Sequence, residues 1–354
     1  MTLKIAVYAI SKNEEQFVER FCRSAADADL ILIADTGSTD GTASKARDCG
    51  AVVHDICISP WRFDLARNAA LALIPRDIDI VISLDLDEVL EPGWREEIER
   101  VWVPGTTRLR YKFDWGHNIL FYYEKIFARH GDRWHHAVHE YPVPDSRIQE
   151  VYAQTDKLLV SHHPDPTKSR GQYMDLLRMA VKEDPRCPRN RFYFCRELTF
   201  YQLWDEAIPA LHEYLAMPEA NWPNERSYAM RLLSDGYAHQ QNWWEALKWA
   251  RLAAAEAPST REPWVKLSEI CYRLNQWQES YFAAKQALAI TDKALVYTCD
   301  PSCWTEKPYD FASIAAHHLG LKQEALELGQ KALELAPHDE RIQGNVRLFE
   351  TACL

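Results

Sequence analysis

The second half of the chain carries a repeat with a period of 34 residues. Tryptophan, glutamate and two alanines recur at this spacing, in the pairs Trp243/Trp277, Glu245/Glu279, Ala250/Ala284 and Ala253/Ala287. A further copy runs from Glu324 to Pro337, after an insertion at 296–308, and a weaker copy starts at Glu206. Small residues at fixed positions let helix pairs stack closely. The pattern predicts an all-helical repeat domain, with an irregular helical bundle as the alternative.

This period and its small residues resemble the tetratricopeptide repeat. The repeats are expected to begin after the proline-rich segment 164–166 and to occupy residues 166–354. A chain of 354 residues is long enough for two domains. We therefore predict a first domain over residues 1–165.

The first half alternates short apolar runs, rich in β-formers, with helix-like stretches from Lys4 to Leu84. That alternation predicts a Rossmann-like α/β domain, a parallel sheet with helices on its faces. Residues 106–163 are rich in aromatic residues and are expected to add antiparallel strands. Ligands of such sheets bind beyond the carboxyl ends of the strands. The predicted site is where three loops gather, at 11–14, 35–41 and 85–88.

The charge balance restricts the partners. The chain has 41 Lys+Arg against 52 Asp+Glu, a net charge of −11, which disfavours nucleic acid and membrane surfaces. Residues 168–196 are locally basic, so nucleic acid stays possible but not favoured. No apolar run approaches the ~18 residues of a membrane span, and charge follows the N-terminus too early for a secretion signal. We expect a cytoplasmic protein whose nine scattered cysteines are reduced.

Asp85 and Asp87 follow the apolar run at 80–84. Residues two apart on an extended backbone point the same way, so both carboxylates are expected to face the crevice. Mg²⁺ and Mn²⁺ prefer such oxygen ligands and share their shell with phosphates, which favours a departing diphosphate. A solvated acidic turn is the alternative. Two other pairs with this spacing do not end a buried strand: Asp27/Asp29 and Asp77/Asp79.

Two further loops supply polar groups at the same edge. The segment 35–41, DTGSTDG, offers backbone donors to a nucleotide, although it also fits a tight turn followed by a helix cap. Arg67, in the segment 63–68, is placed to meet a diphosphate or to form a surface salt bridge.

Five segments together resemble the family-2 glycosyltransferases of the GT-A fold: ISKNEE (10–15), DTGSTDGT (35–42), FDLARN (63–68), LDLDE (84–88) and WHHAVHE (134–140). The branch concerned carries C-terminal tetratricopeptide-like repeats and is similar to bacteriocin peptide glycosyltransferases and lipooligosaccharide core glucosyltransferases. The resemblance covers nearly the whole chain. It implies inverting transfer from a nucleotide sugar, commonly UDP-linked, with Mn²⁺ or Mg²⁺, to a hydroxyl or thiol on a peptide, protein or glycan.

The resemblance also implies which residues bind the donor and the cation. The donor-binding residues are Ala9, Glu14, Asp35, Thr36, Arg67, Asp85 and Leu86. The metal ligands are Asp85, Asp87 and His162, with His163 as the adjacent competitor. Thr36 stands where many relatives outside this branch have an acidic residue that contacts the base, so the resemblance does not fix uracil as that base.

Inverting transfer needs a base that removes the acceptor proton. Glu140 is the candidate base, and His139 is expected to orient the acceptor or the base. The alternative is a structural glutamate paired with an arginine such as Arg133. A zinc site made of His162 with His135, His136 and His139 is a further alternative, but the sequence contains no HExxH or Cys/His spacing.

The leading hypothesis is glycosyl transfer to a macromolecular or peptide acceptor held by the repeats, because stacked helix pairs present a concave surface suited to extended chains. Three alternatives remain. The acceptor is a hydroxymethylated base of DNA, as the basic segment suggests; the enzyme is a nucleotidyltransferase, which also uses paired aspartates; or the chain is a non-catalytic scaffold that binds partners through its repeats.

Overall fold

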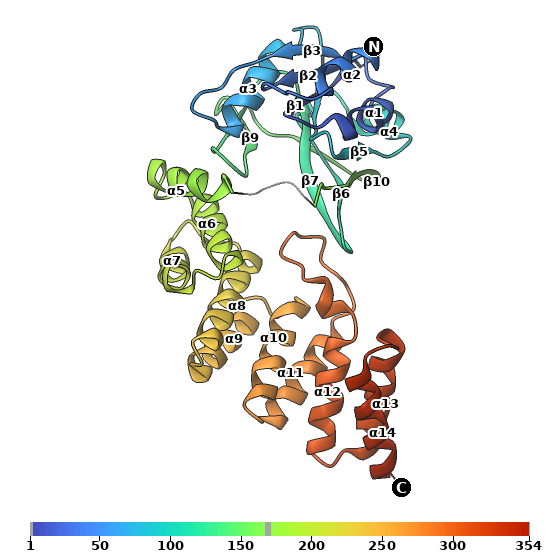
Figure 1. Ribbon diagram of the computed structural model, residues 1–354, viewed down its shortest axis with the longest axis vertical. Coiled ribbons are helices and arrows are strands. Elements are labelled where there is room, and N and C mark those ends of the chain that lie inside the picture. The colour runs from blue at the N-terminus through green and yellow to red at the C-terminus, as the bar shows by residue number, and fades with distance from the viewer. Residues whose placement is uncertain (1–2, 167–170, 354) are drawn as a thin grey trace. The chain divides into compact units, whose positions relative to one another are not determined.

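The computed structural model describes residues 3–166 and 171–353. The chain divides into two compact units, Met1–Asp184 and Pro185–Leu354 (Figure 1). The first is a mixed α/β domain and the second is all-helical, which confirms the predicted fold class. The division falls after Asp184 rather than after residue 165, because helix α5 (Tyr173–Glu183) packs on the first unit. Arg62 pairs with Glu183 at 2.7 Å, and the rings of Phe63 and Tyr173 are 6.0 Å apart.

An eight-stranded sheet forms the centre of the first unit, in the order β3-β2-β1-β4-β7-β6-β10-β5. The parallel strands are β1 (Ile5–Ser11), β2 (Leu30–Asp35), β3 (Val52–Asp55) and β4 (Ile80–Ser83). The added strands are β5 (Glu88–Leu90), β6 (Arg108–Gly116), β7 (Ile119–Ala128) and β10 (Tyr152–His162). β7 is antiparallel to β4 and β6, as predicted, but β10 runs parallel to β6.

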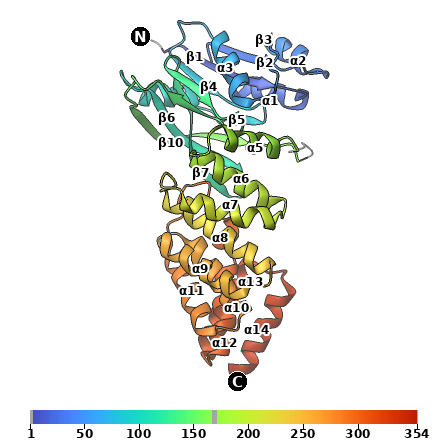
Figure 2. The same cartoon turned by 90° about the vertical axis from the view of Figure 1, so that its left-hand side faces the viewer.

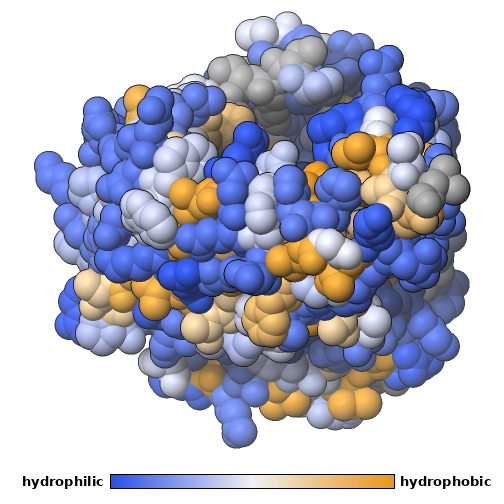
Figure 3. All heavy atoms as spheres, turned by 90° about the horizontal axis from the view of Figure 1, so that it is seen from below, coloured by the Kyte–Doolittle hydropathy of each residue, from blue (hydrophilic) through white to orange (hydrophobic). Residues whose placement is uncertain are grey.

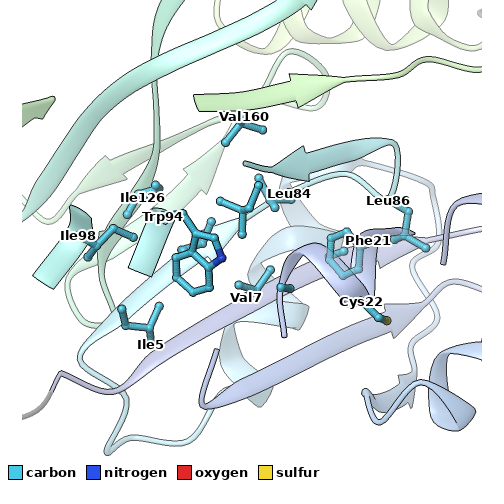
Figure 4. Packing of buried hydrophobic residues seen from close by; sticks show 14 of the residues in the cluster. Ile5, Val7, Phe21, Cys22, Leu84, Leu86, Trp94, Ile98, Ile126 and Val160 are labelled. Atoms are coloured by element: carbon cyan, nitrogen blue, oxygen red, sulfur yellow. The ribbon is translucent and has the colours of Figure 1, made fainter. Parts of the chain in front are cut away.

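Apolar side chains on both faces of the sheet hold the helices in place. One face packs against α1 (Glu15–Ser24) and α4 (Trp94–Val101), through Phe21 and Trp94 (Figure 4). The other face packs against α3 (Phe63–Leu73) and Trp134. Helix α2 (Thr42–Asp48) follows β2, and a two-stranded sheet pairs β8 (Asp132–His135) with β9 (Tyr141–Pro144). Burial at ~25 cal/mol per Å² makes these faces the main source of the unit's stability.

The β6–β7 hairpin reaches past the end of β4. Ile82 lies opposite Ile126, and β7 is antiparallel to β4, so the residues of β7 that precede Ile126 continue beyond the carboxyl end of β4. Figure 1 shows this hairpin extending away from the parallel strands. Phe121 pairs with Phe113 in it, and the turn that follows β6 joins the two strands. The hairpin therefore borders the edge at which the sequence predicts the site.

Successive helices pair along the second unit, and the helices follow one another from α6 to α14 (Figure 2). They are α6 (Pro188–Phe200), α7 (Trp204–Ala216), α8 (Pro223–His239), α9 (Trp243–Glu256), α10 (Arg261–Arg273), α11 (Trp277–Ala289), α12 (Lys307–His318), α13 (Lys322–Leu335) and α14 (Glu340–Cys353). The repeat predicts this arrangement well. Trp243 and Trp277 begin α9 and α11, and the recurring alanines are fully buried. This region is tetratricopeptide-like.

Residues 291–306, which we call the strap, follow α11 and include the short 3₁₀ helix η1 (Pro301–Trp304). The ring of Tyr297 stacks on Tyr193 of α6 at 6.2 Å. Arg231 of α8 donates to the carbonyl of Thr298 at 3.0 Å, and Trp304 donates to Glu262 of α10 at 2.9 Å. The strap thus covers part of the row formed by the first helix of successive pairs. The insertion in the repeat pattern corresponds to this segment.

Helix length, cysteine state and surface polarity can be described for residues 3–166 and 171–353. No helix there combines the length and the apolar character that crossing a bilayer requires. The nine cysteines are present as thiols. On the face drawn in Figure 3, hydrophobic residues appear as separate patches among hydrophilic ones, as on the surface of ordinary globular proteins.

Candidate active site

The segment that carries Asp85 and Asp87 forms a turn. We predicted an extended backbone with both carboxylates side by side, and this was wrong in its local geometry. β4 ends at Ser83, and the Glu88 N–H donates to the Asp85 carbonyl at 2.9 Å. Leu86, between the two aspartates, is fully buried in the apolar cluster that contains Phe21 (Figure 4). Burial of this leucine stabilises the turn, and the two carboxylates therefore have different neighbours.

Arg67 of α3 lies at the centre of the site. Its buried guanidinium donates to Asp85 Oδ1 at 2.7 Å, to Ser83 Oγ at 3.2 Å and to the carboxylate of Glu140. Burial disfavours the charge, but the attraction of Asp85 and Glu140 outweighs it and raises the pKa of Arg67 well above its ordinary value. The surface salt bridge considered for Arg67 is therefore replaced by a buried network.

Lys125 of β7 completes this network and was missed by the sequence analysis. Its ammonium group lies 3.1 Å from Glu88 Oε1 and 3.5 Å from Asp85 Oδ2, and it is almost fully buried. Burial disfavours its charge, yet Asp85 and Glu88 raise the pKa of Lys125 well above its ordinary value. A single lysine within the aromatic and apolar run ILFYYEKIFA was the available signal. Such a residue needs a carboxylate partner when it is buried.

Asp87 faces the histidine that the resemblance assigned to the metal. Asp87 Oδ2 lies 3.4 Å from His162 Nε2, and these side chains are 14% and 11% exposed. His162 contacts Asp87 with its imidazole, whereas His163 donates its backbone N–H to the Asp87 carbonyl at 2.8 Å. Two cis ligands at the ~2.1 Å bonding distance of Mg²⁺ lie about 3 Å apart. The Asp87–His162 pair therefore fits a shared divalent cation.

The cation would need further ligands from a bound molecule. Within residues 3–166 and 171–353, no group of three or more His, Cys, Asp or Glu side chains is arranged to hold an ion. Asp85, the second predicted ligand, already contacts Arg67 and Lys125. Mg²⁺ commonly takes one or two carboxylates plus phosphate oxygens and water, so two protein ligands suit a phosphate complex. The zinc alternative has no ligand set in the described chain.

Glu140, the predicted base, has a side chain that is 9% exposed and is held by Arg67 rather than by Arg133. Arg67 thereby links it to Asp85 through one guanidinium. His139, its neighbour, adopts a positive φ of 52°, and its ring lies 5.8 Å from that of Tyr173. The backbone N–H of Phe63 donates to Ala137 at 3.0 Å, which fixes this loop against the start of α3. The two predicted catalytic residues thus lie beside the arginine of the network.

Asp35 shapes the loop that follows β2. Its carboxylate accepts from the N–H groups of Gly37 (3.1 Å) and Ser38 (2.8 Å) and from the hydroxyls of Ser11 (2.9 Å) and Ser38 (2.5 Å). Burial raises the pKa of Asp35, but these hydrogen bonds outweigh it and lower the pKa. Four bonds use the acceptor capacity of a carboxylate. We infer that Asp35 organises this loop.

The remaining predicted donor-binding residues occupy different surroundings. Thr36 is half-buried and donates through both its N–H and its hydroxyl to the Ser11 carbonyl, at 2.9 and 2.8 Å. Glu14 is buried just before α1, and its N–H donates to Thr42 Oγ1 at 2.8 Å. Ala9 and Leu86 are fully buried in the core, so neither residue exposes surface to a ligand.

Among the described residues of the basic segment, several cations have partners. Lys168 and Arg170 lie outside the described residues. Arg186 and Arg191 form ion pairs with Glu219 and Glu213. Two others lie over one aromatic ring, that of Tyr193: Arg189 at 4.9 Å and Arg196 at 4.6 Å. Carboxylate partners reduce the attraction of such residues for phosphate, so the DNA alternative gains no support here.

Comparisons with known proteins concern the repeats. No family model matches the chain. Solved structures with similarity include MamA (16% identity, TM-score 0.38, 48% of this chain and 89% of that chain). YrrB, described as a TPR protein with an unusual peptide-binding site, has 13% identity and a TM-score of 0.41 over 49% and 82%. Pseudomonas aeruginosa pilF has 13% identity and a TM-score of 0.40 over 50% and 72%.

The fold defines a class of architecture. The chain has a mixed α/β domain followed by tetratricopeptide-like helical repeats. The pairing of its own helices, with buried alanines at a 34-residue spacing, defines the repeat region.

Proposed function

We propose that the chain is a metal-dependent glycosyltransferase that transfers a sugar from a nucleoside diphosphate donor to a hydroxyl or thiol acceptor. The observation that carries this proposal is the pairing of Asp87 with His162, 3.4 Å apart, next to the Arg67–Asp85 ion pair at the carboxyl end of β4. This edge is where α/β sheets bind ligands. The resemblance to family-2 glycosyltransferases of the GT-A fold supports the same assignment.

In this proposal, the nucleoside and the diphosphate of the donor bind at the ends of neighbouring strands. β1 and β2 end at Ser11 and Asp35, where the loop offers its backbone and hydroxyl groups to a nucleoside. β4 is the other neighbour of β1, so the Asp85–Asp87 turn follows next along the edge. A cation bound by Asp87 and His162 would stabilise the negative charge on the departing diphosphate. Asp87 and His162 would hold that cation and thereby fix where the phosphate group binds.

Arg67 and Lys125 are each paired with carboxylates, so phosphate binding at this edge would rely on a divalent cation. The network contains two cations, Arg67 and Lys125, against three carboxylates, Asp85, Glu88 and Glu140. Fixed charges in a site of low dielectric act more strongly than in water. Arg67 also connects the diphosphate region to Glu140. We propose Glu140 as the base that accepts the acceptor proton as the sugar–phosphate bond breaks, with inversion at the anomeric carbon.

The helical unit is proposed to bind the acceptor as a peptide or protein. Stacked helix pairs present an extended surface for a chain. The strap covers part of the row that includes α6, α8 and α10, through Tyr297, Thr298 and Trp304. An acceptor would therefore contact the strap or the helices that it leaves uncovered.

The experiment compares two aspartates with the same spacing motif. UDP-glucose, UDP-galactose, UDP-N-acetylglucosamine and GDP-mannose are incubated with Mn²⁺ or Mg²⁺, and release of nucleoside diphosphate is measured. Asp87→Asn should lower release at least about 100-fold if it removes a cation ligand. Asp77→Asn is the matched control, because Asp77 is exposed and paired with Lys4. Equal release by wild type and Asp87→Asn would contradict the assignment.

The same assay tests the other classes. A nucleotidyltransferase would release pyrophosphate from a nucleoside triphosphate and leave the sugar nucleotides intact. A non-catalytic scaffold would bind no nucleotide in the presence of divalent cation, and Asp87→Asn would then be indistinguishable from Asp77→Asn. A salt-dependent gel shift with modified and plain DNA tests the DNA acceptor, since phosphate contacts weaken steeply as salt rises.

A further inference from the structure

An aromatic cluster on the β6–β7 hairpin has no part in the function proposed above. Phe113 contacts Phe121 at 5.4 Å, Tyr123 at 5.1 Å and Trp115 at 6.1 Å between ring centroids. Phe113 is fully buried, whereas Trp115, near the end of β6, is 43% exposed. The cluster therefore runs from the core of the first unit to a large aromatic side chain at the surface.

Trp115 lies directly beside the candidate cation ligands. Its ring is 4.4 Å from the ring of His162, and His162 Nε2 is 3.4 Å from Asp87 Oδ2. The hairpin extends beyond the carboxyl end of β4, which places it on the opposite side of the Asp85–Asp87 turn from β1 and β2. A donor with its nucleoside at the β1–β2 loop and its phosphates at Asp87 would therefore continue toward this hairpin.

We infer that Trp115 packs against the pyranose ring of the donor sugar; this rests on the proposed function. The sugar is bonded to the terminal phosphate. It therefore lies next to the cation ligands, on the side away from the nucleoside. An indole ring offers a broad apolar face to the C–H groups of a pyranose and adds affinity by removing apolar surface from water. Trp115 is a specificity-determining residue in this assignment, with no role in the proton transfer.

A competing role for Trp115 is to hold the ring of His162 in position. The two roles predict different effects of Trp115 on the affinity for the nucleoside diphosphate that lacks the sugar. A support for His162 would affect the cation and hence every diphosphate ligand equally. A sugar-binding residue would affect only the ligand that carries the ring.

The test measures dissociation constants by calorimetry in the presence of Mn²⁺. The sugar nucleotide that binds the wild type most tightly, among the four named above, is compared with its own nucleoside diphosphate. Trp115→Ala should weaken the sugar nucleotide about tenfold and change the diphosphate less than about twofold. Trp115→Phe should restore most of the loss. Trp244→Ala is the matched control, since Trp244 is 68% exposed on α9 in the helical unit.

Each outcome is decisive. A Trp115→Ala variant that weakens both ligands by the same factor overturns the inference in favour of support for His162. An unchanged affinity for the sugar nucleotide overturns it as well. Failure of the wild type to bind any of these diphosphates overturns the proposed function and the inference with it, and this result is distinct from the first two. Unchanged diphosphate binding by Trp115→Ala also shows that the variant is folded.

Discussion

The edge of the sheet and the helical unit are packed by different means. At the edge, buried charged side chains contact one another, with Arg67 between Asp85 and Glu140 and Lys125 beside Glu88. In the helical unit, small residues such as Ala250, Ala284 and Gly329 let helices approach closely. Burying charge costs free energy that pairing offsets only in good geometry, whereas small-residue packing has no such cost. The helical unit also buries charged side chains such as Glu225 and Asp310, but the recurring contacts between its helices are made by small residues.

Breaking the edge network should have the largest effect. Arg67→Ala leaves Asp85 and Glu140 without their shared cation, and loss of one partner of a buried ion pair costs about 3–5 kcal/mol. The free energy of unfolding of the first unit, measured in denaturant, should fall by that order. Nucleotide binding should fall with it.

Arg62→Ala is the control for Arg67→Ala. Arg62 precedes α3 and pairs with Asp64 and Glu183 at a position that is 20% exposed. Its loss should cost less than that of Arg67 and should leave nucleotide binding close to wild type. Equal losses of stability in the two variants would contradict the view that the network is the electrostatic centre of the unit.

Overpacking the repeats should have an intermediate effect confined to the helical unit. A Cβ atom on Gly329 would lie 3.0 Å from the ring of Phe349, so Gly329→Leu has no room without displacing α14. We expect a loss of about 1–3 kcal/mol in the unfolding of the second unit. Hydrogen exchange should report faster opening of α13 and α14, while nucleotide affinity stays unchanged. A change in nucleotide affinity would show that the two regions are coupled.

Acid should remove a contribution to the stability of the first unit that comes from a residue away from the site, Glu97. The hydrogen bonds from Arg100 and Thr155 lower the pKa of Glu97, whereas burial raises it. The net effect is a pKa of about 2. Because the folded-state pKa lies below the ordinary value, this stabilisation is present above about pH 4.5 and is lost as the pH falls toward 2. Glu97→Gln should cost about 1–2 kcal/mol at pH 7.

The measurement for Glu97→Gln is thermal unfolding at pH 7, 4 and 2. The difference from wild type should be largest at pH 7 and should disappear near pH 2. A difference that stays constant across this range would mean that the charge of Glu97 has no part in the effect.

The smallest effect is expected at the strap. Tyr297→Phe removes a hydroxyl that donates to Glu225 and keeps the ring stacked on Tyr193. Tyr214 still donates to Glu225 at 2.6 Å, so the carboxylate keeps a partner. We expect a loss of about 1 kcal/mol in the unfolding of the helical unit. A loss several times larger would indicate that the strap is essential to the packing of the repeats.

Much of the architecture was predictable because periodicity is local. The 34-residue spacing predicted the helical repeats, and the alternation of apolar runs with helical stretches predicted the parallel strands. The position of Asp87 at this edge followed from the rule on strand ends, whereas His162 was assigned through the family resemblance. The choice of His162 over His163 did not follow from that rule, because it depends on which side chain β10 turns toward Asp87.

The sequence by itself determined the two kinds of domain and the edge of the sheet where polar residues gather, because these follow from patterns within short stretches of chain. Only the tertiary structure decided that Asp85 is bound by Arg67 and Lys125 while Asp87 faces His162. It also decided that Glu140 shares Arg67 with Asp85. These contacts join residues on different strands, helices and loops, and burial of Leu86 sets the turn between the two aspartates.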